Sequence, residues 1–197
     1  KPNNGGPKIF SVSGHVNKPG NYEIRLGTSF ADLLEMAGGV RNGHKLKAVI
    51  PGGSSMPVLP GDTMMGLTMD YDSIQKAGSG LGSGAVVVMD ETTCMVRACQ
   101  RISRFYFKES CGQCTPCREG TVWMYRMLTR VVEGKATLED LHTFKAAAGQ
   151  IEGHTICAFG EAAAWPVQGM LRHYWHEFEY YILNGRSIVD AKLEAAA

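Results

Sequence analysis

Apolar and polar side chains alternate along two short segments near the start of the chain. Residues 9–13 and 22–26 each follow the two-residue period of a strand with one buried face. Between them, residues 18–21 read Lys-Pro-Gly-Asn. Proline followed by glycine suits a type II turn, because the glycine can adopt a positive φ. The pattern therefore predicts a β-hairpin.

The apolar pattern then changes to the spacing of a short helix. Phe30 and Leu33 fall on one helical face. Thr28 or Ser29 can supply the side-chain oxygen that caps such a helix, and the two glycines at 38–39 can end it. The pattern predicts one short helix after the hairpin.

Further strands are predicted at residues 47–50 and 85–89, where apolar residues run together. Residues 61–85 are expected to be irregular, with the glycine run at 78–84 forming a flexible connection. No helix is predicted directly after this run, so we do not expect it to hold a phosphate group. A hairpin, a helix and further strands in this order are typical of a small β-grasp domain, expected over residues 1–90.

From Thr92 onward the apolar residues recur with the 3.6-residue period of helices. Two long helices come first. A third is expected to begin at Thr137, where Asp140 completes a capping box, and a fourth near Pro166, whose fixed φ suits a first helical turn. Four amphipathic helices joined by short connections predict a helical bundle over residues 91–185.

The expected fold class is therefore α+β, with a β-grasp domain followed by an all-α bundle. The length of 197 residues agrees with two domains, since a single domain usually has about 100–150 residues. The alanine-rich residues 186–197 are expected to form a tail.

Composition and charge exclude several classes of protein. Twenty Lys and Arg residues against nineteen Asp and Glu residues give a formal net charge of +1, so nucleic acid is not an expected partner. No apolar run approaches the roughly 20 residues of a membrane span, so we expect no direct membrane insertion. No Ser-His-Asp arrangement or carboxylate pair stands out, and no catalytic residue is predicted.

The cysteines carry the most specific chemical signal. Cys111, Cys114 and Cys117 form a C-x₂-C-x₂-C run, and Cys157 follows 40 residues later. Three thiolates at this spacing can occupy three corners of an iron–sulfur cubane, and a remote fourth thiolate can complete the ligand set. The spacing favours a [4Fe–4S] site, and in a reducing compartment clustered cysteines indicate metal chemistry rather than disulfides.

Two alternatives remain open at this point. A structural zinc ion could use the three clustered thiols with either Cys157 or His154, although zinc ligands usually come as two separated pairs. The clustered cysteines could also be unliganded thiols. Cys94 and Cys99 are expected to be ordinary buried residues, because their five-residue separation in a helix does not bring them together on one face.

Charged and polar groups beside the cysteine run are expected to tune such a cluster. Lys108 and Arg118 flank the run, and cations favour the more negatively charged reduced state. Gly112 and the neighbouring loop amides can donate hydrogen bonds to sulfur, which also raises the reduction potential.

The sequence around these cysteines resembles the cluster-binding motif of the NADH-binding flavoprotein subunit of respiratory complex I. The motif at residues 109–121 reads ESCGQCTPCREGT. Other segments share the resemblance, which spans roughly residues 1–185. They are residues 13–20, 50–55, 69–73, 80–84, 155–158 and 163–169.

The resemblance implies a β-grasp domain of the soluble-ligand-binding type and a bundle that holds one [4Fe–4S] cluster. The positions of Cys111, Cys114, Cys117 and Cys157 match the family's ligands one by one. In this family the cluster takes electrons from reduced FMN and passes them toward the large iron–sulfur subunit and finally quinone. A two-iron ferredoxin-like subunit is a further implied partner.

The resemblance also implies what this chain leaves out. The family's FMN and NADH sites lie mainly in an N-terminal α/β domain with a glycine-rich flavin loop, and we expect neither site here. The chain resembles the C-terminal portion of the subunit. The implied location is the peripheral arm on the cytoplasmic side of the bacterial inner membrane, or on the mitochondrial matrix side.

Two other functions remain open. The same motif occurs in flavoprotein subunits of NAD-linked hydrogenases and formate dehydrogenases. A binding module, in which zinc only joins the helices, is an alternative without redox activity.

Overall fold

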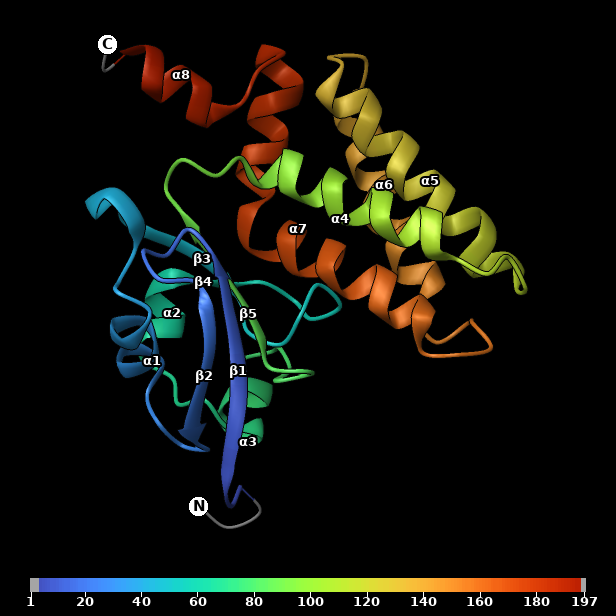
Figure 1. Ribbon diagram of the computed structural model, residues 1–197. Helices are drawn as coiled ribbons and strands as arrows, with labels where there is room; N and C mark the ends of the chain where they lie inside the picture. Colours follow the sequence, from blue (N-terminus) through green and yellow to red (C-terminus); the bar gives the residue numbers. More distant parts are fainter. Residues whose placement is uncertain (1–3, 196–197) are drawn as a thin grey trace. The chain divides into compact units, whose positions relative to one another are not determined.

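A computed structural model describes residues 4–195 of the chain (Figure 1). The chain divides into two compact units, Lys1–Thr93 and Cys94–Ala197. The first unit combines a sheet with short helices and the second is all helical, so the predicted α+β class is confirmed. Among the described helices, none is both long and apolar enough to cross a membrane.

The first unit contains a mixed five-stranded sheet with the order β2-β1-β5-β3-β4. The predicted hairpin is present, because β1 and β2 pair in antiparallel register, while β5 pairs parallel to β1 and antiparallel to β3. The elements are β1 (Pro7–Gly14), β2 (Gly20–Arg25), α1 (Phe30–Met36), a 3₁₀ turn (Arg41–Gly43), β3 (Leu46–Ile50), β4 (Leu59–Pro60), α2 (Gly61–Met65), α3 (Tyr71–Lys76) and β5 (Ala85–Asp90).

The core of this unit lies between the sheet and its helices. Phe10, Phe30 and Leu33 are buried in it, and they are the apolar positions of the predicted strand and helix. Ser29 is the residue that caps α1, since its side chain accepts a hydrogen bond from the backbone N–H of Asp32.

The segment expected to be irregular contains two short helices, so that expectation is wrong for α2 and α3. Asp70 caps α3 by accepting a hydrogen bond of 2.9 Å from the backbone N–H of Ser73. Gly61 opens α2 at a place where an added Cβ would lie 2.7 Å from the carbonyl oxygen of Leu46. A local cap and a close backbone approach therefore fix helices that apolar periodicity does not indicate.

The glycine run also differs from the flexible connection that we expected. The backbone N–H of Ser83 donates a hydrogen bond of 3.1 Å to the carbonyl oxygen of Gly52. A Cβ on Gly52 would lie 2.3 Å from the carbonyl oxygen of Gly80, and one on Gly82 would lie 2.2 Å from that of Gly52. The glycines therefore allow two backbone segments to touch.

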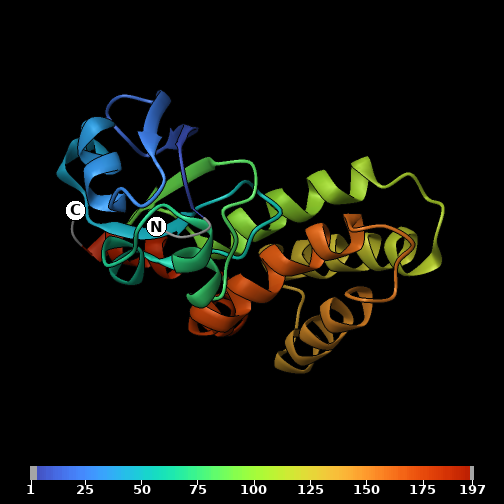
Figure 2. The ribbon, with the colours of Figure 1, turned by 90° about the horizontal axis from the view of Figure 1, so that it is seen from below.

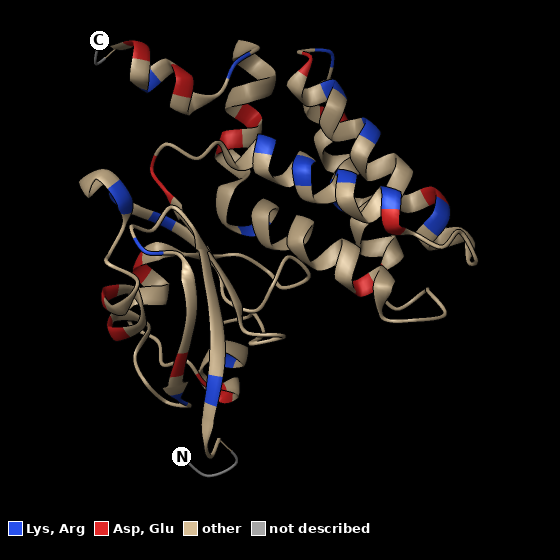
Figure 3. Cartoon of the chain, in the orientation of Figure 1, with Lys and Arg blue, Asp and Glu red and all other residues tan. Residues whose placement is uncertain are grey.

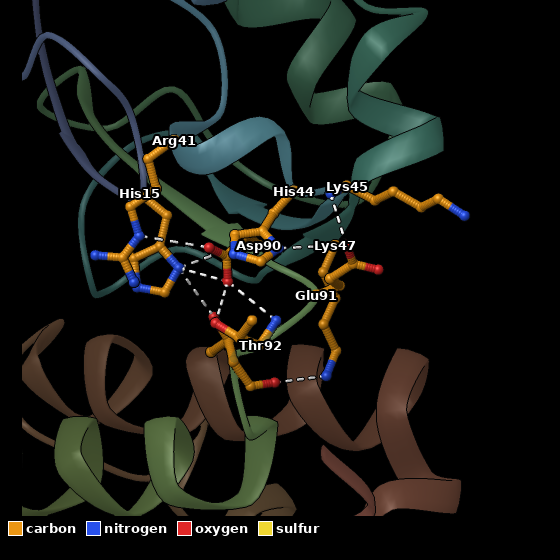
Figure 4. Close-up of polar contacts among 9 residues, drawn as sticks. His15, Arg41, His44, Lys45, Lys47, Asp90, Glu91 and Thr92 are labelled. Atoms are coloured by element: carbon orange, nitrogen blue, oxygen red, sulfur yellow. Dashed lines mark hydrogen bonds and ion pairs between the residues drawn. The ribbon is translucent and has the colours of Figure 1, made fainter. Parts of the chain in front are cut away.

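A buried carboxylate holds the segment that follows β5 (Figure 4). The side chain of Asp90 is fully buried and accepts hydrogen bonds from the backbone N–H and the hydroxyl of Thr92, at 3.0 and 2.6 Å. The Nδ1 atom of His15 lies 2.8 Å from one of its oxygens, and the Nε atom of Arg41 lies 3.5 Å from the other. Burial alone raises the pKa of Asp90, but the hydrogen bonds from Thr92 and His15 outweigh it and lower the pKa.

Replacing Asp90 with asparagine is expected to reduce the free energy of unfolding by about 2 kcal/mol, because charge-assisted hydrogen bonds are lost. The folded-state pKa of Asp90 lies below the ordinary value of 3.8, so its contribution is complete above that value. It is lost as the pH falls through the lower folded-state pKa. Urea denaturation at neutral and acid pH measures both effects. Equal stability of the Asp90→Asn variant and the unchanged chain at neutral pH would contradict the prediction.

The second unit is a bundle of helices that follow one another closely along the chain. The capping box predicted at Thr137 and Asp140 is confirmed. The helices are α4 (Met95–Glu109), α5 (Thr115–Val132), α6 (Leu138–Ile151), α7 (Phe159–Asn184) and α8 (Ile188–Ala195).

Two predictions for this unit need correction. The fourth long helix begins at Phe159 instead of near Pro166, which lies inside it. A proline removes one backbone donor, and the remaining hydrogen bonds and the burial of the helix hold α7 together. The expected tail contains α8, where Val189 is buried and Asp190 forms an ion pair of 2.9 Å with Arg97.

Candidate metal centre

Three of the candidate cysteines lie where α4 ends and α5 begins. Cys111 lies in the connecting loop, Cys114 is the residue directly before α5, and Cys117 lies in the first turn of that helix. Gly112 has a φ of 77°, which an L side chain rarely adopts, so a glycine allows the chain to turn between the first two cysteines. Pro116 fits the first turn of α5, where its missing N–H has no helical partner to lose.

Cys117 is the most enclosed of these thiols. Its relative exposure is 5%, and the Oγ atom of Ser110 lies 3.1 Å from its Sγ atom. The hydroxyl of Thr121 donates a hydrogen bond of 2.7 Å to the Cys117 carbonyl oxygen. Polar side chains from the loop and from the next turn thus fix the position of this sulfur.

Cys157 lies on the loop between α6 and α7, two residues before α7 begins. The hydroxyl of Thr155 donates a hydrogen bond of 2.8 Å to the Cys157 carbonyl oxygen. Gly160 lies directly beside this loop, because a Cβ there would lie 2.3 Å from two side-chain atoms of Thr155. Both views of the bundle show this loop at the same end as the α4–α5 loop (Figures 1 and 2).

The other three thiols lie close enough to Cys117 to influence its ionisation. Burial raises the pKa of Cys117, a hydrogen bond with Ser110 opposes the increase, and charge on Cys114, Cys111 and Cys157 raises the pKa further. Within the described residues, no group of three or more His, Cys, Asp or Glu side chains is arranged to hold a metal ion. The set of four thiols has the chemistry that an iron–sulfur cubane needs, and a cubane spreads its thiolates around several iron atoms.

The positive ends of two long helices lie beside the candidate ligands. Cys114 and Cys117 flank the N-terminus of α5, and Cys157 precedes the N-terminus of α7. Unpaired backbone N–H groups and the helix dipole favour negative charge at such positions. Arg118 lies beside the run, where its Nε atom forms an ion pair of 2.9 Å with Glu119 and its Nη1 atom donates a hydrogen bond of 2.9 Å to the carbonyl oxygen of Gly112.

Glu152, which the sequence did not single out, joins the end of α6 to α7. Its carboxylate accepts hydrogen bonds of 2.7 Å from Trp165 and 2.8 Å from Gln168. Hydrogen bonds from Gln168 and Trp165 lower the pKa of Glu152. Nearby, the backbone N–H of Gly153 donates a hydrogen bond of 3.0 Å to Glu161. These contacts fix both ends of the loop that carries Cys157.

The remaining candidates lie in different environments. Cys99 is 1% exposed inside α4, and burial raises its pKa to about 12. Cys94 lies directly before α4 instead of within a helix as expected. The exposed His154 has its Nδ1 atom 2.9 Å from the carbonyl oxygen of Glu152. The burial of Cys99 agrees with the expectation of an ordinary core residue.

Comparison with known protein families covers both units. Residues 97–181 match the NADH-ubiquinone oxidoreductase-F iron-sulfur binding region, a range that includes all four candidate cysteines. Residues 9–59 match the SLBB domain, which confirms the predicted β-grasp domain of the soluble-ligand-binding type.

Individual proteins show the same relationship. The F subunit of NADH-quinone oxidoreductase in Rickettsia felis is 53% identical over 191 residues, which are 96% of this chain and 45% of that protein. Its counterpart in Rickettsia rickettsii is 55% identical over 181 residues, which are 91% of this chain and 43% of that protein. The chain thus spans less than half the length of these relatives.

Solved structures also resemble the chain. Crystal structures of an NAD⁺-reducing [NiFe]-hydrogenase align with TM-scores of 0.81 in the H₂-reduced state and 0.83 in the air-oxidized state, both at 29% identity. The alignments cover 97% and 99% of this chain and 33% and 34% of the hydrogenase chain. On the strength of the higher identity to the Rickettsia proteins and the two domain matches, the chain belongs to the family of NADH-quinone oxidoreductase F subunits and corresponds to their C-terminal portion.

Proposed function

We propose that the chain is the electron-relay portion of an NADH-quinone oxidoreductase, with Cys111, Cys114, Cys117 and Cys157 as ligands of one [4Fe–4S] cluster. The observation that carries the proposal is the grouping of four thiols at one end of a bundle whose sequence matches an iron–sulfur binding region. A bound [4Fe–4S] cluster supplies reversible one-electron transfer. In the complete subunit the electrons come from NADH through FMN and go toward the large iron–sulfur subunit and quinone.

The residues of this chain hold and tune the site. Burial of Cys117 and its contact with Ser110 shield one ligand from water. The N-termini of α5 and α7 stabilise the extra negative charge of reduction, and Arg118 holds the loop through its hydrogen bond to the Gly112 carbonyl oxygen. Thr155 keeps the loop of Cys157 in place through its hydrogen bond.

The test is anaerobic reconstitution of the chain with iron and sulfide, followed by EPR spectroscopy of the dithionite-reduced sample. We expect a fast-relaxing [4Fe–4S]⁺ signal and about four iron atoms per chain. Stoichiometric zinc without this signal would refute the relay and support a binding module.

A second candidate is the corresponding subunit of an NAD-linked hydrogenase, which the similarity to the hydrogenase structures favours. The relay chemistry of the four cysteines is the same in both cases. The two are distinguished by the proteins that purify with the chain in its native complex, which are quinone-reducing subunits in the first case and a nickel–iron subunit in the second.

Replacing Gly160 with alanine is expected to weaken cluster retention. The new Cβ would displace Thr155 and break its hydrogen bond to the Cys157 carbonyl oxygen, at a cost of about 1–3 kcal/mol for overpacking. The iron content after gel filtration measures cluster retention, and thermal unfolding measures the loss of stability.

Gly149 provides the matched control for this substitution. It lies in α6 with open space around an added Cβ, so Gly149→Ala is expected to stabilise the helix by about 1 kcal/mol and to leave the iron content unchanged. Equal iron content in the Gly160 and Gly149 variants would show that the contact with Thr155 does not support the site.

A further inference from the structure

The hydroxyl of Ser110 contacts the sulfur of one proposed ligand directly. Its Oγ atom lies 3.1 Å from the Sγ atom of Cys117. Cys117 is 5% exposed, whereas Cys111 and Cys157 are exposed. Water therefore competes less for the sulfur of Cys117 than for the other two, and a hydrogen bond from the protein to this sulfur is less screened.

The direction of this hydrogen bond follows from the chemistry of cluster ligation. Between a thiol and a hydroxyl, either atom could be the donor. Iron–sulfur clusters are held by cysteine thiolates, which have no proton to donate. The serine hydroxyl carries one proton and can donate it. With a cluster bound, Ser110 is therefore the donor and the Sγ atom of Cys117 is the acceptor.

The surrounding backbone holds Ser110 in the position of a donor. The backbone N–H of Gly112 donates a hydrogen bond of 3.4 Å to the Oγ atom of Ser110, which leaves the single hydroxyl proton for the sulfur. The backbone N–H of Ser110 donates a hydrogen bond of 3.1 Å to the carbonyl oxygen of Tyr106, a buried residue of α4. The contacts form a chain from Gly112 through Ser110 to Cys117, and hydrogen bonds in such a chain strengthen one another.

The loop that carries the clustered cysteines supplies no formal charge of its own. Residues 110–117 contain no Lys, Arg, Asp or Glu, and this loop is tan in Figure 3. The next residue, Arg118, is paired with Glu119. A neutral hydroxyl on the buried sulfur is thus a local means of stabilising negative charge at the site.

We propose that Ser110 raises the reduction potential of the site by donating a hydrogen bond to the sulfur of Cys117. This inference rests on the proposed function. Reduction adds one negative charge, and a hydrogen bond to a ligand sulfur stabilises the reduced state more than the oxidised state. One electron enters the site, supplied in the test by dithionite, and no proton moves because Ser110 keeps its own. Ser110 is thus a positioning residue that acts through Cys117.

The test is a redox titration of the full, anaerobically reconstituted chain, followed by EPR spectroscopy. Ser110→Ala is expected to lower the equilibrium constant for one-electron reduction by about threefold to tenfold, which makes the potential more negative by about 28–59 mV. Ser110→Thr keeps a hydroxyl at the same position, so it is expected to keep the potential of the unchanged chain.

Ser103 provides the matched control. It is fully buried in α4, seven residues before Ser110, and it lies near the thiol of Cys99, which is not a proposed ligand. Ser103→Ala also removes a buried hydroxyl beside a cysteine, and it is expected to leave the potential unchanged. A fall in potential that occurs in Ser110→Ala alone would support the proposal.

An unchanged potential in Ser110→Ala would overturn the proposal, and so would an equal fall in Ser110→Thr or Ser103→Ala. If Ser110→Ala loses its iron, electron–nuclear double resonance of the reduced samples in D₂O decides. An exchangeable deuteron coupled to the site is expected in the unchanged chain and in Ser110→Thr, and its absence would overturn the proposal.

The EPR signal of the unchanged chain separates this outcome from failure of the relay. A normal [4Fe–4S]⁺ signal with a potential that does not depend on Ser110 refutes only the role of this hydroxyl. Absence of the signal from the unchanged chain refutes the proposed function, and the role of Ser110 with it.

Discussion

A chain with Cys157 replaced by serine is expected to lose most of its iron after anaerobic reconstitution and gel filtration. The proposed ligand set has three thiolates close together in sequence and only this one from the α6–α7 loop. Iron–sulfur clusters are held by thiolates, and a serine hydroxyl is not deprotonated at neutral pH. Cys157 is also exposed, so water can reach the position that it leaves. Iron and sulfide analysis, together with the EPR signal of the reduced sample, measures the loss.

Cys99 supplies the control for this experiment. Its thiol is buried within α4 and its pKa is raised to about 12, so it remains a neutral core residue. Cys99→Ala is expected to bind as much iron as the unchanged chain and to keep the same reduction potential. If Cys157→Ser also keeps its iron content and potential, Cys157 is not a ligand.

The parts of the fold that could be predicted are those fixed by local pattern. The alternation of apolar and polar residues predicts the hairpin of β1 and β2, because one face of each strand packs into the core. The cap at Thr137, and a cap at either Thr28 or Ser29, could be predicted because a helix N-terminus needs a side-chain acceptor that only a few residue types provide, and the structure selects Ser29.

The parts that could not be predicted depend on contacts between distant segments. The glycines at 52 and 82 are each required by the backbone of the other segment, which lies about thirty residues away in the sequence. Pro166 resembles a helix start, but the burial of its neighbours extends α7 back to Phe159. A single sequence carries no sign of either arrangement.

The candidate site also contains residues that could be predicted from the sequence and residues that could not. The cysteines were found because a repeated two-residue spacer is specific to metal and cluster ligation. Ser110 and Thr155 were missed, since a hydroxyl near a cysteine is common and only the folded loop shows its hydrogen bond. Glu152 was missed because its partners Trp165 and Gln168 are more than ten residues away.

Glu152→Ala is expected to lower the free energy of unfolding by about 3 kcal/mol, because two hydrogen bonds to a charged carboxylate are lost. The substitution should also reduce iron retention, since Glu152 fixes the start of the loop that carries Cys157. The folded-state pKa of Glu152 lies below 4.5, so its contribution is complete above that pH and is lost as the pH falls through the lowered value. Urea denaturation between neutral and acid pH measures the loss of stability and its pH dependence, and iron analysis measures the loss of iron retention.

Glu133 offers a closely matched control, because it also follows the last residue of a helix. Its carboxylate forms only an exposed ion pair of 2.8 Å with Lys135, and such pairs contribute about 0–1 kcal/mol. Glu133→Ala is therefore expected to change neither the stability nor the iron content by a comparable amount. Should the two alanine variants behave alike, the hydrogen bonds of Glu152 would not be what holds the Cys157 loop. A selective loss of iron in Glu152→Ala would instead show that the α6–α7 connection positions the fourth thiol.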